Sequence, residues 1–333
     1  MSAAIVITGA AGFVGRACVA AARAAGHPVR AVVRRDHDLP AEWDEGVEVH
    51  QADLAKAPDL NAVLAGACAV IHAAAGAGDS HAADTQDATA HLIASMTGQG
   101  ARLVLVSSLS VYGYAAVPDH ATLDETTPPD PDMARRDAYT RAKYAQEMQG
   151  VAAAQHHGLD LWILRPGAIY GPDRLWSARL GYPKGGRVLV PGGDVPVPAI
   201  HVDSCAAGLV AACTAARPAR SDLPIITGTG SVSTVNLIDP APPHQRDWLE
   251  AIGKTSVTAL PVSLLMKMAR GLDLAGDLWP AFGRRLPVGL REATLAARFK
   301  PLRYSRARAE DWLGHHPATD FKTHMQSLTG EAS

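Results

Sequence analysis

A chain of 333 residues with 47% hydrophobic and 19% charged side chains has the composition of an ordinary globular protein, and its length allows one large domain together with a smaller one. The formal net charge of −2 excludes a strongly basic nucleic-acid-binding protein. The four cysteines and fourteen histidines show no disulfide or ligand spacing. We therefore expect no metal site, and reduced thiols in a cytoplasmic protein without a secretory signal.

Short apolar runs alternate with helical stretches over the first 170 residues. The apolar runs predict strands at residues 3–9, 29–34, 47–54, 68–75, 102–108 and 159–166, and the stretches between them predict helices at 15–26, 60–67, 84–98 and 138–157. Uninterrupted Ile, Val and Leu runs between helices indicate a parallel sheet that is covered on both faces. The predicted fold class is therefore α/β, with a doubly wound parallel sheet that binds ligands at the carboxyl ends of its strands.

The composition changes after Gly171. Residues 173–198 are rich in Gly and Pro, as expected of a long loop that reaches over a site. Residues 199–230 contain a strand end and a helix that return to the sheet. We therefore predict a sheet domain at residues 1–172, with 199–230 added to it, and a smaller second region at residues 173–198 and 231–333.

Two late segments of the second region have distinctive compositions. Residues 259–279 are apolar, but Lys267, Arg270 and Asp273 favour an amphipathic core or interface helix over a transmembrane span. The basic stretch at residues 298–309 predicts a solvated helix face, with an anion-binding role as the alternative.

Three glycines stand at the first turn from strand to helix. The segment ITGAAGFVG, residues 7–15, contains Gly9, Gly12 and Gly15. Glycine permits a tight turn and lets the backbone approach a pyrophosphate closely, and the helix N-terminus adds amide donors and partial positive charge. At this place in a doubly wound pattern, the three glycines predict a dinucleotide site.

The end of the second predicted strand bears on the identity of the dinucleotide. A site for NAD usually has an acidic residue there, which bonds the ribose 2′-hydroxyl. This chain has Arg34 and Arg35 instead, and a guanidinium suits a 2′-phosphate. NADP is therefore favoured, while Asp36 keeps NAD open if the strand ends a residue or two later.

A tyrosine and a lysine lie four residues apart near the start of the predicted helix at residues 138–157. Tyr139 and Lys143 share one helix face at this spacing. The spacing alone also fits a solvated helix side with a snorkelling lysine, so the preceding motifs must decide between the two interpretations.

Further motifs follow one another along the chain: ADL at 52–54, HAAA at 72–75, VSSLSVYG at 106–113, YTRAK at 139–143, RPGAIYGP at 165–172 and HVD at 201–203. With TGAAGFVG at 8–15, this series resembles the extended short-chain dehydrogenase/reductase family, also called the NAD-dependent epimerase/dehydratase superfamily, over almost the whole chain. The resemblance implies a Rossmann dinucleotide-binding domain and a C-terminal region that binds the substrate.

The resemblance also implies the residues of the site. Ser108, Tyr139 and Lys143 would be catalytic. The cofactor would be bound by Gly9, Gly12, Phe13, Val14, Gly15, Arg34, Arg35, Asp53, Leu54, Ala73, Ala74, Ala75, Ser107, Tyr139, Lys143, Pro166, Gly167 and Ile169.

In this family Tyr139 would be the acid/base, with Lys143 as its partner and as a ligand of the nicotinamide ribose. Bringing a phenol from a pKa near 10 toward 7 takes about 4 kcal/mol, which a cation about 4 Å away supplies at an effective dielectric of about 20. Ser108 would steady the substrate oxygen. Ser107 competes with it for this role, because neighbouring strand residues face opposite ways.

The motifs also bear on the reaction. Ala168 stands where many nucleotide-sugar members have an asparagine, and Leu109-Ser110 replace the Asp-Glu pair of the dehydratases. These departures favour an NAD(P)(H)-dependent oxidoreductase that exchanges hydride with a carbonyl or secondary alcohol, similar to dihydroflavonol-reductase-like and hydroxysteroid-dehydrogenase-like members. A nucleotide-sugar epimerase or dehydratase with bound NAD is the alternative, followed by a non-catalytic NAD(P)-binding protein.

Four other residues receive mainly structural interpretations. We expect His201 to be structural, Asp203 to cap a helix, and Arg165 to anchor a strand end. Tyr112 could equally border the substrate pocket or pack in the core. The family further suggests a homodimer.

Overall fold

The computed structural model describes residues 3–35, 39–40, 43, 46–74, 81–192, 194–218 and 230–330. A seven-stranded sheet with the order β3-β2-β1-β4-β5-β7-β12 forms its centre, and every neighbouring pair in it is parallel. The strands are β1 (Ala4–Thr8), β2 (Val29–Val33), β3 (Val47–Gln51), β4 (Ala67–His72), β5 (Arg102–Val106), β7 (Asp160–Pro166) and β12 (Ser231–Leu237).

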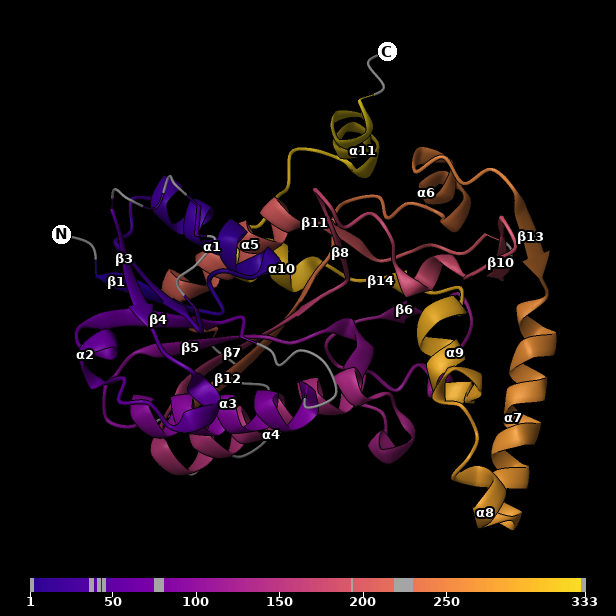
Figure 1. The fold of residues 1–333 in the computed structure, drawn as a ribbon, viewed down its shortest axis with the longest axis horizontal. Coiled ribbons are helices and arrows are strands. Elements are labelled where there is room, and N and C mark those ends of the chain that lie inside the picture. Colours follow the sequence, from indigo (N-terminus) through magenta and orange to yellow (C-terminus); the bar gives the residue numbers. More distant parts are fainter. Residues whose placement is uncertain are drawn as a thin grey trace.

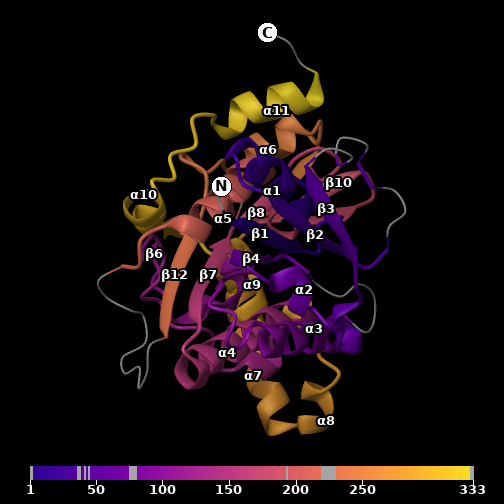
Figure 2. The same cartoon turned by 90° about the vertical axis from the view of Figure 1, so that its left-hand side faces the viewer.

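Helices cover both faces of this sheet, as the uninterrupted apolar strands predict (Figures 1 and 2). One face carries α1 (Phe13–Ala24), α5 (Val202–Thr214) and α10 (Ala307–Leu313); the other carries α2 (Asn61–Leu64), α3 (His81–Met96) and α4 (Ala138–His157).

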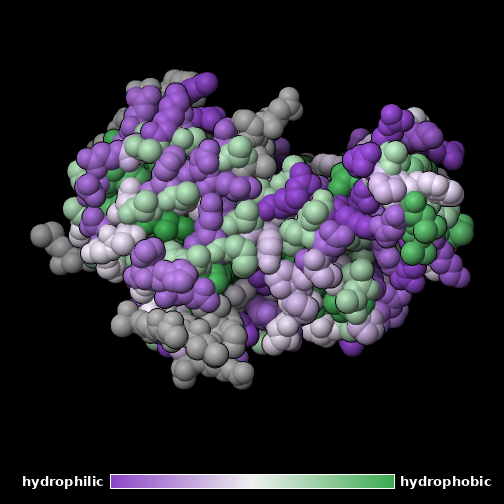
Figure 3. Space-filling model, turned by 90° about the horizontal axis from the view of Figure 1, so that it is seen from below, coloured by the Kyte–Doolittle hydropathy of each residue, from purple (hydrophilic) through white to green (hydrophobic). Residues whose placement is uncertain are grey.

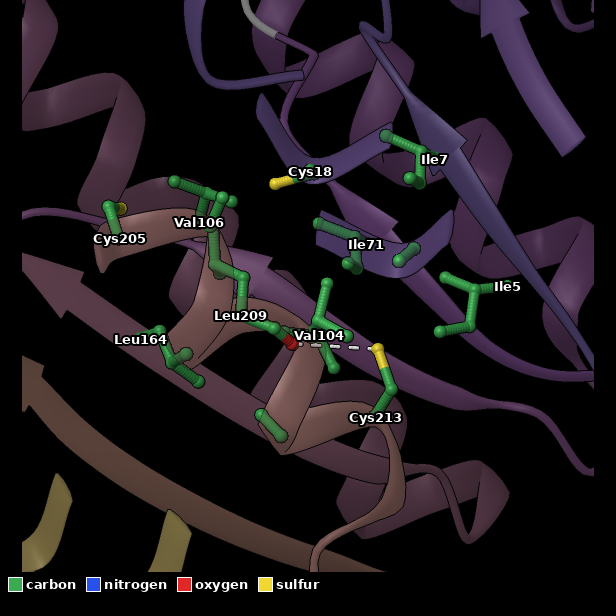
Figure 4. Close-up of a cluster of buried hydrophobic side chains, with 14 of the residues drawn as sticks. Ile5, Ile7, Cys18, Ile71, Val104, Val106, Leu164, Cys205, Leu209 and Cys213 are labelled. Carbon is green, nitrogen blue, oxygen red and sulfur yellow. Dashed lines mark hydrogen bonds between the residues drawn. The ribbon is translucent and has the colours of Figure 1, made fainter. Parts of the chain in front are cut away.

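Strand β1 shows why both faces must be covered. Ile5 and Ile7 pack toward α1 and α5, while Val6 between them packs toward the helices of the opposite face. Figure 4 shows the hydrophobic cluster that contains Ile5 and Ile7, in which the Cys213 thiol donates to the carbonyl of Leu209 at 3.5 Å. The cysteines of the chain are free, and burial raises the pKa of the three that are buried, which keeps them protonated at neutral pH.

The seventh strand is absent from the sequence prediction. Residues 231–333 were all expected in the second region, but β12 pairs with β7 along its whole length, from Ser231 with Asp160 to Leu237 with Pro166. Helix α10 also returns to the sheet, where Ala309 joins the core. The predicted boundary is therefore wrong for these two elements, because their pairing depends on contacts with strands far away in the sequence.

The second region consists of small sheets and helices beyond the carboxyl ends of the strands (Figure 1). Its strands are β6 (Thr122–Leu123), β8 (Ala168–Tyr170), β9 (Tyr182–Lys184), β10 (Arg187–Pro191), β11 (Ala199–His201), β13 (Val257–Leu260) and β14 (Arg303–Tyr304), and its helices are α6 (Gln245–Ala251), α7 (Val262–Leu278), α8 (Pro280–Gly283), α9 (Glu292–Phe299) and α11 (Phe321–Thr329). Of these strands, β6, β8 and β11 come from residues that were predicted in the sheet domain. Among the described helices, none combines the length and apolar character needed to cross a bilayer.

Candidate active site

The glycine turn lies at the carboxyl end of β1. Gly9 has a φ of +67°, which favours glycine, and a Cβ on it would lie 2.7 Å from the backbone of Ala74. A Cβ on Gly15 would lie only 2.1 Å from the carbonyl oxygen of Gly9. Gly12 is the N-cap residue of α1 and offers no capping side chain, so the first amides of that helix remain available to an anion. The turn therefore fits a dinucleotide pyrophosphate.

The other predicted cofactor residues lie along the same edge of the sheet. Arg34 and Arg35 follow β2 and are exposed. Asp53 caps a short 3-10 helix by accepting a bond from the amide of Ala55 at 3.2 Å, and Leu54 is buried beneath it. Asp36 and Ala75 lie outside the described residues.

Three further predicted positions lie beyond β4 and β7. Ala73 follows β4, and its amide bonds the carbonyl of Thr8 at 3.2 Å, close to the glycine turn. Gly167 and Ile169 follow β7, and a Cβ on Gly167 would lie 2.0 Å from the carbonyl oxygen of Pro198. The positions named from the motifs thus gather at the carboxyl ends of the strands.

Helix α4 carries Tyr139 in its first turn. Asp137 caps this helix by accepting bonds from the amide of Thr140 at 3.0 Å and from its hydroxyl at 2.9 Å. The capped helix start presents Tyr139 to a pocket that Ser108 also lines. The solvated-helix interpretation therefore fails for this pair, because Lys143 is buried and Tyr139 faces a pocket.

The acidity of Tyr139 differs from the sequence expectation. Burial raises the pKa of the phenol, and a hydrogen bond with Ser108 opposes this only in part. The residue as a whole is 43% exposed because the pocket is open, while its hydroxyl lies beside Ser108. Without a bound cofactor, Tyr139 therefore stays protonated at neutral pH, and Lys143 alone does not bring its pKa toward 7.

Lys143 is held deep in the fold. Its Nζ donates to the carbonyl of Val106 at 2.9 Å and to Gln146 Oε1 at 3.1 Å, so two of its three protons have partners and one remains for a ligand. Burial lowers the pKa of the ammonium to about 8, although the carboxylate of Glu147 opposes this.

A chain of polar side chains leads from this lysine to β1. Gln146 Nε2 donates to Thr89 Oγ1 at 2.7 Å, and Thr89 donates its own proton to a carbonyl at 2.8 Å. His72 Nε2, 3.0 Å from Thr89, must therefore carry a proton, and its Nδ1 accepts from Thr8 at 2.7 Å. Burial, together with nearby Lys143, lowers the pKa of His72 to about 3, so the ring stays neutral.

The two candidate serines face opposite ways, as the strand geometry requires. Ser107 is buried and donates to Glu147 of α4. Arg165 of β7 also bonds Glu147, with distances of 2.8 and 2.6 Å. Ser108 is the serine that lines the pocket with Tyr139. Any contact of Ser107 with a cofactor would therefore be made by its main chain.

The pocket has a volume of about 290 Å³ and includes parts of the chain that are far apart in sequence. Ser108 and Tyr139 line one side, and the loop after β8 contributes Trp176. Trp176 belongs to the Gly- and Pro-rich segment at residues 173–198, and Arg298 of α9 belongs to the region after residue 231, so both parts of the predicted second region line this pocket. Arg298 belongs to the basic stretch for which a solvated helix face was favoured and an anion-binding role was the alternative, and it lines the pocket.

The remaining structural interpretations are mostly confirmed. Arg165 anchors β7 to α4 and lies 4.5 Å from the centre of the Tyr112 ring, which is fully buried.

The residue that caps α5 is His201, which accepts a bond from the amide of Asp203 at 3.3 Å. The prediction of Asp203 as the cap is wrong, because its carboxylate lies exposed in the first turn of the helix. His201 also stacks on His324 at 3.9 Å, which supports its structural role.

The sequence and the fold match known proteins. A family model described as the NAD dependent epimerase/dehydratase family matches residues 5–223. A ceramide reductase of Caulobacter vibrioides is 32% identical over 215 residues, which are 63% of this chain and 60% of that protein. The match therefore spans less than two thirds of that relative. A 3-diazoavenalumate denitrifying reductase of a Streptomyces species is 32% identical over 241 residues, 62% of this chain and 71% of that protein.

A solved structure of MoeE5 in complex with UDP-glucuronic acid and NAD has a TM-score of 0.67 and 20% identity, and the match covers 98% of each chain. At this identity the likeness concerns the fold, and it confirms the predicted doubly wound α/β class. Together with the family model, it confirms the resemblance that the motifs suggested: the chain belongs to the NAD-dependent epimerase/dehydratase family.

Proposed function

We propose that this protein is an NAD(P)(H)-dependent reductase or dehydrogenase that exchanges hydride with a carbonyl or secondary alcohol. The observation that carries the proposal is the group formed by Ser108, Tyr139 and Lys143. The serine and the tyrosine share a hydrogen bond at the mouth of a pocket, and the lysine is buried on the same helix with one proton unassigned.

The chain's own residues provide the proton chemistry. Tyr139 is protonated at neutral pH, since burial raises the pKa of its phenol, and a protonated phenol can donate to an oxygen that gains negative charge. Ser108 lies beside it and can bond the same oxygen, which stabilises that charge. A bound nicotinamide dinucleotide supplies or accepts the hydride.

The proposed cofactor residues follow from the same edge of the sheet. The amides of the glycine turn would hold the pyrophosphate, and the remaining proton of Lys143 would bond the nicotinamide ribose. Arg34 and Arg35 would bind a 2′-phosphate, so we propose NADP over NAD. Both are exposed after β2 and have room to reach a ligand.

One observation favours a second candidate, a nucleotide-sugar epimerase or dehydratase. Arg174 and Arg298 line the pocket without a carboxylate partner among the described residues, and such guanidinium groups suit a diphosphate. Ala168 argues against it, because this position offers no side-chain donor and its amide already bonds the carbonyl of Pro198 at 2.6 Å.

The test combines binding and turnover. Replacing Tyr139 with Phe removes the proton donor but keeps the ring, so NADPH binding should stay within about twofold while turnover of a ketone panel falls by about 10²–10⁴. Tyr144→Phe is the matched control on the same helix, since Tyr144 lies outside the pocket lining. Full activity of Tyr139→Phe would refute the proposed role of the tyrosine.

Titration with NADPH, NADH and UDP-sugars separates the candidates. We expect NADPH to bind more tightly than NADH, with no stabilisation of the fold by UDP-sugars. Stabilisation by a UDP-sugar, with NAD retained through purification, would instead establish the second candidate. Binding of a dinucleotide with no turnover of any substrate would support the non-catalytic alternative.

A further inference from the structure

Helix α7 has two apolar faces, and only one of them is covered. On the inner face Ala269 is buried against Leu295 and Phe299 of α9. The outer face bears Leu264, Met268, Leu274 and Leu278, whose exposed fractions run from 55% to 76%. Their positions follow helical spacing and form one stripe opposite the buried face. The solvent-facing side of a surface helix normally carries polar residues, so this exposed apolar stripe is suited to contact with a binding partner.

The stripe continues onto the tip of the molecule. Trp279 at the turn is 68% exposed, and Phe282 of α8 is exposed beside it. Helix α8 folds back on α7 at Gly276 and Gly283, where a Cβ on Gly276 would lie 2.9 Å from the Cα of Gly283. This close approach fixes the hairpin, so its apolar residues are presented on a firm support. We call residues 262–290 the α7–α8 hairpin.

The unpaired charges around the stripe are positive. The two acidic residues of the hairpin are both engaged, Asp273 with Arg291 at 3.0 Å and Asp277 with Arg135. Lys267, Arg284 and Arg285 are exposed and have no ion-pair or hydrogen-bond partner for their side chains among the described residues. The outer surface of the hairpin therefore offers apolar side chains with uncompensated positive charge. Figure 3 shows hydrophobic residues among hydrophilic ones at the right-hand end, where the hairpin lies in Figure 1.

We infer that the α7–α8 hairpin docks on an anionic lipid bilayer surface. Leucines and a tryptophan at the tip can enter the boundary between headgroups and acyl chains, while lysine and arginine bond the lipid phosphates. Burial of these side chains removes the exposed apolar surface from water, and the charge of the bilayer complements the three unpaired cations. This mode of binding requires no membrane-spanning segment.

A second copy of the chain fits this surface less well. Symmetric dimers bring the same patch of both subunits together. Lys267, Arg284 and Arg285 of both copies would then gather in one interface, and like charges oppose such an interface. The dimer that the family suggests would therefore form through another surface.

The location also connects the bilayer to the proposed active site. The outer stripe belongs to α7, α7 packs on α9, and α9 lines the pocket with Thr294, Ala297 and Arg298. The bilayer surface would thus lie one helix layer from the pocket. The docking inference rests only on the hairpin, so it stands or falls independently of the proposed reaction.

Vesicle co-sedimentation of the full chain tests the inference. Wild-type protein should sediment with vesicles of phosphatidylcholine and phosphatidylglycerol, and much less with pure phosphatidylcholine. Arg284→Gln with Arg285→Gln should lower partition into the anionic vesicles about thirtyfold, since each cation contributes about 1 kcal/mol near such a surface. Leu278→Ser with Trp279→Ser should lower it at least tenfold by removing buried apolar area.

Val49→Ser is the control, because Val49 is also an exposed apolar residue but lies on β3. It should leave partition unchanged, and none of these variants should alter turnover of a water-soluble substrate. The inference is overturned if wild-type protein ignores anionic vesicles, or if Val49→Ser lowers partition equally. It is also overturned if sedimentation velocity shows a dimer that the Leu278→Ser and Trp279→Ser variant dissociates.

Discussion

The buried pair of Arg165 and Glu147 joins helix α4 to the sheet, and replacing Arg165 with Met gives a defined test of that role. Arg165 makes two bonds to Glu147, at 2.8 and 2.6 Å, and the two side chains are 7% and 1% exposed. Loss of the guanidinium would leave the carboxylate buried with Ser107 as its remaining partner.

The expected magnitude follows from this burial. Removing one member of a buried ion pair costs about 3–5 kcal/mol, because the other charge stays buried without compensation. Typical total stability is about 5–15 kcal/mol, so Arg165→Met should shift unfolding strongly. Adding Glu147→Leu removes the stranded charge, and the double variant should be more stable than Arg165→Met by about 2 kcal/mol or more.

Urea unfolding of the two single variants and the double variant measures the coupling. Arg270→Met is the control, since Arg270 also bonds a carboxylate, Glu292, but is exposed, and its loss should have a much smaller effect. Turnover should also fall in Arg165→Met. The substitution removes a partner of Glu147, which lies one turn beyond Lys143 on α4, so it should also disturb the position of the lysine. Additive effects in the double variant, or a cost of Arg165→Met no larger than that of Arg270→Met, would refute the reasoning.

Two further predictions concern the glycine turn and the buried lysine. Gly15→Ala places a Cβ 2.1 Å from the Gly9 carbonyl oxygen, whereas Gly12→Ala places one 3.2 Å from it; Gly15→Ala should therefore weaken NADPH binding at least tenfold more than Gly12→Ala, by calorimetry. The pKa of Lys143 is lowered from 10.5 to about 8 in the fold. Between these values the unfolded chain holds more protons, so wild-type stability should rise with pH by about 3 kcal/mol relative to Lys143→Met. Parallel pH curves for the two proteins would contradict this.

Local sequence determined much of the framework. Strands such as β1 follow from apolar runs, and the turn at Gly9 follows from glycine spacing, because both depend on neighbouring residues alone. Helical periodicity placed Tyr139 and Lys143 on one helix face, and the family motifs pointed to these two residues and Ser108 as the proposed catalytic group. These features are visible without knowledge of any distant contact.

Tertiary structure decided what depends on distant partners. Neighbouring residues in the extended chain after β5 face opposite ways, so the sequence indicates that Ser107 and Ser108 face apart. Only the packing of α4 and β7 shows that Ser107 is the one that bonds Glu147. The strand β12 pairs in register with β7, which lies about 70 residues earlier, and Arg298 enters the pocket on a helix whose sequence resembles a solvated one.

The pKa of Tyr139 is another property that local sequence alone does not determine. The helical spacing to Lys143 suggested that the lysine would lower this pKa, but burial dominates in the fold and raises it. The outer face of α7 is a further case: its sequence indicates only an amphipathic helix, whereas the position of α9 decides which apolar side is covered and which is left for a partner. Spacing along one element fixes which residues share a face, and the packing of all elements fixes what that face meets.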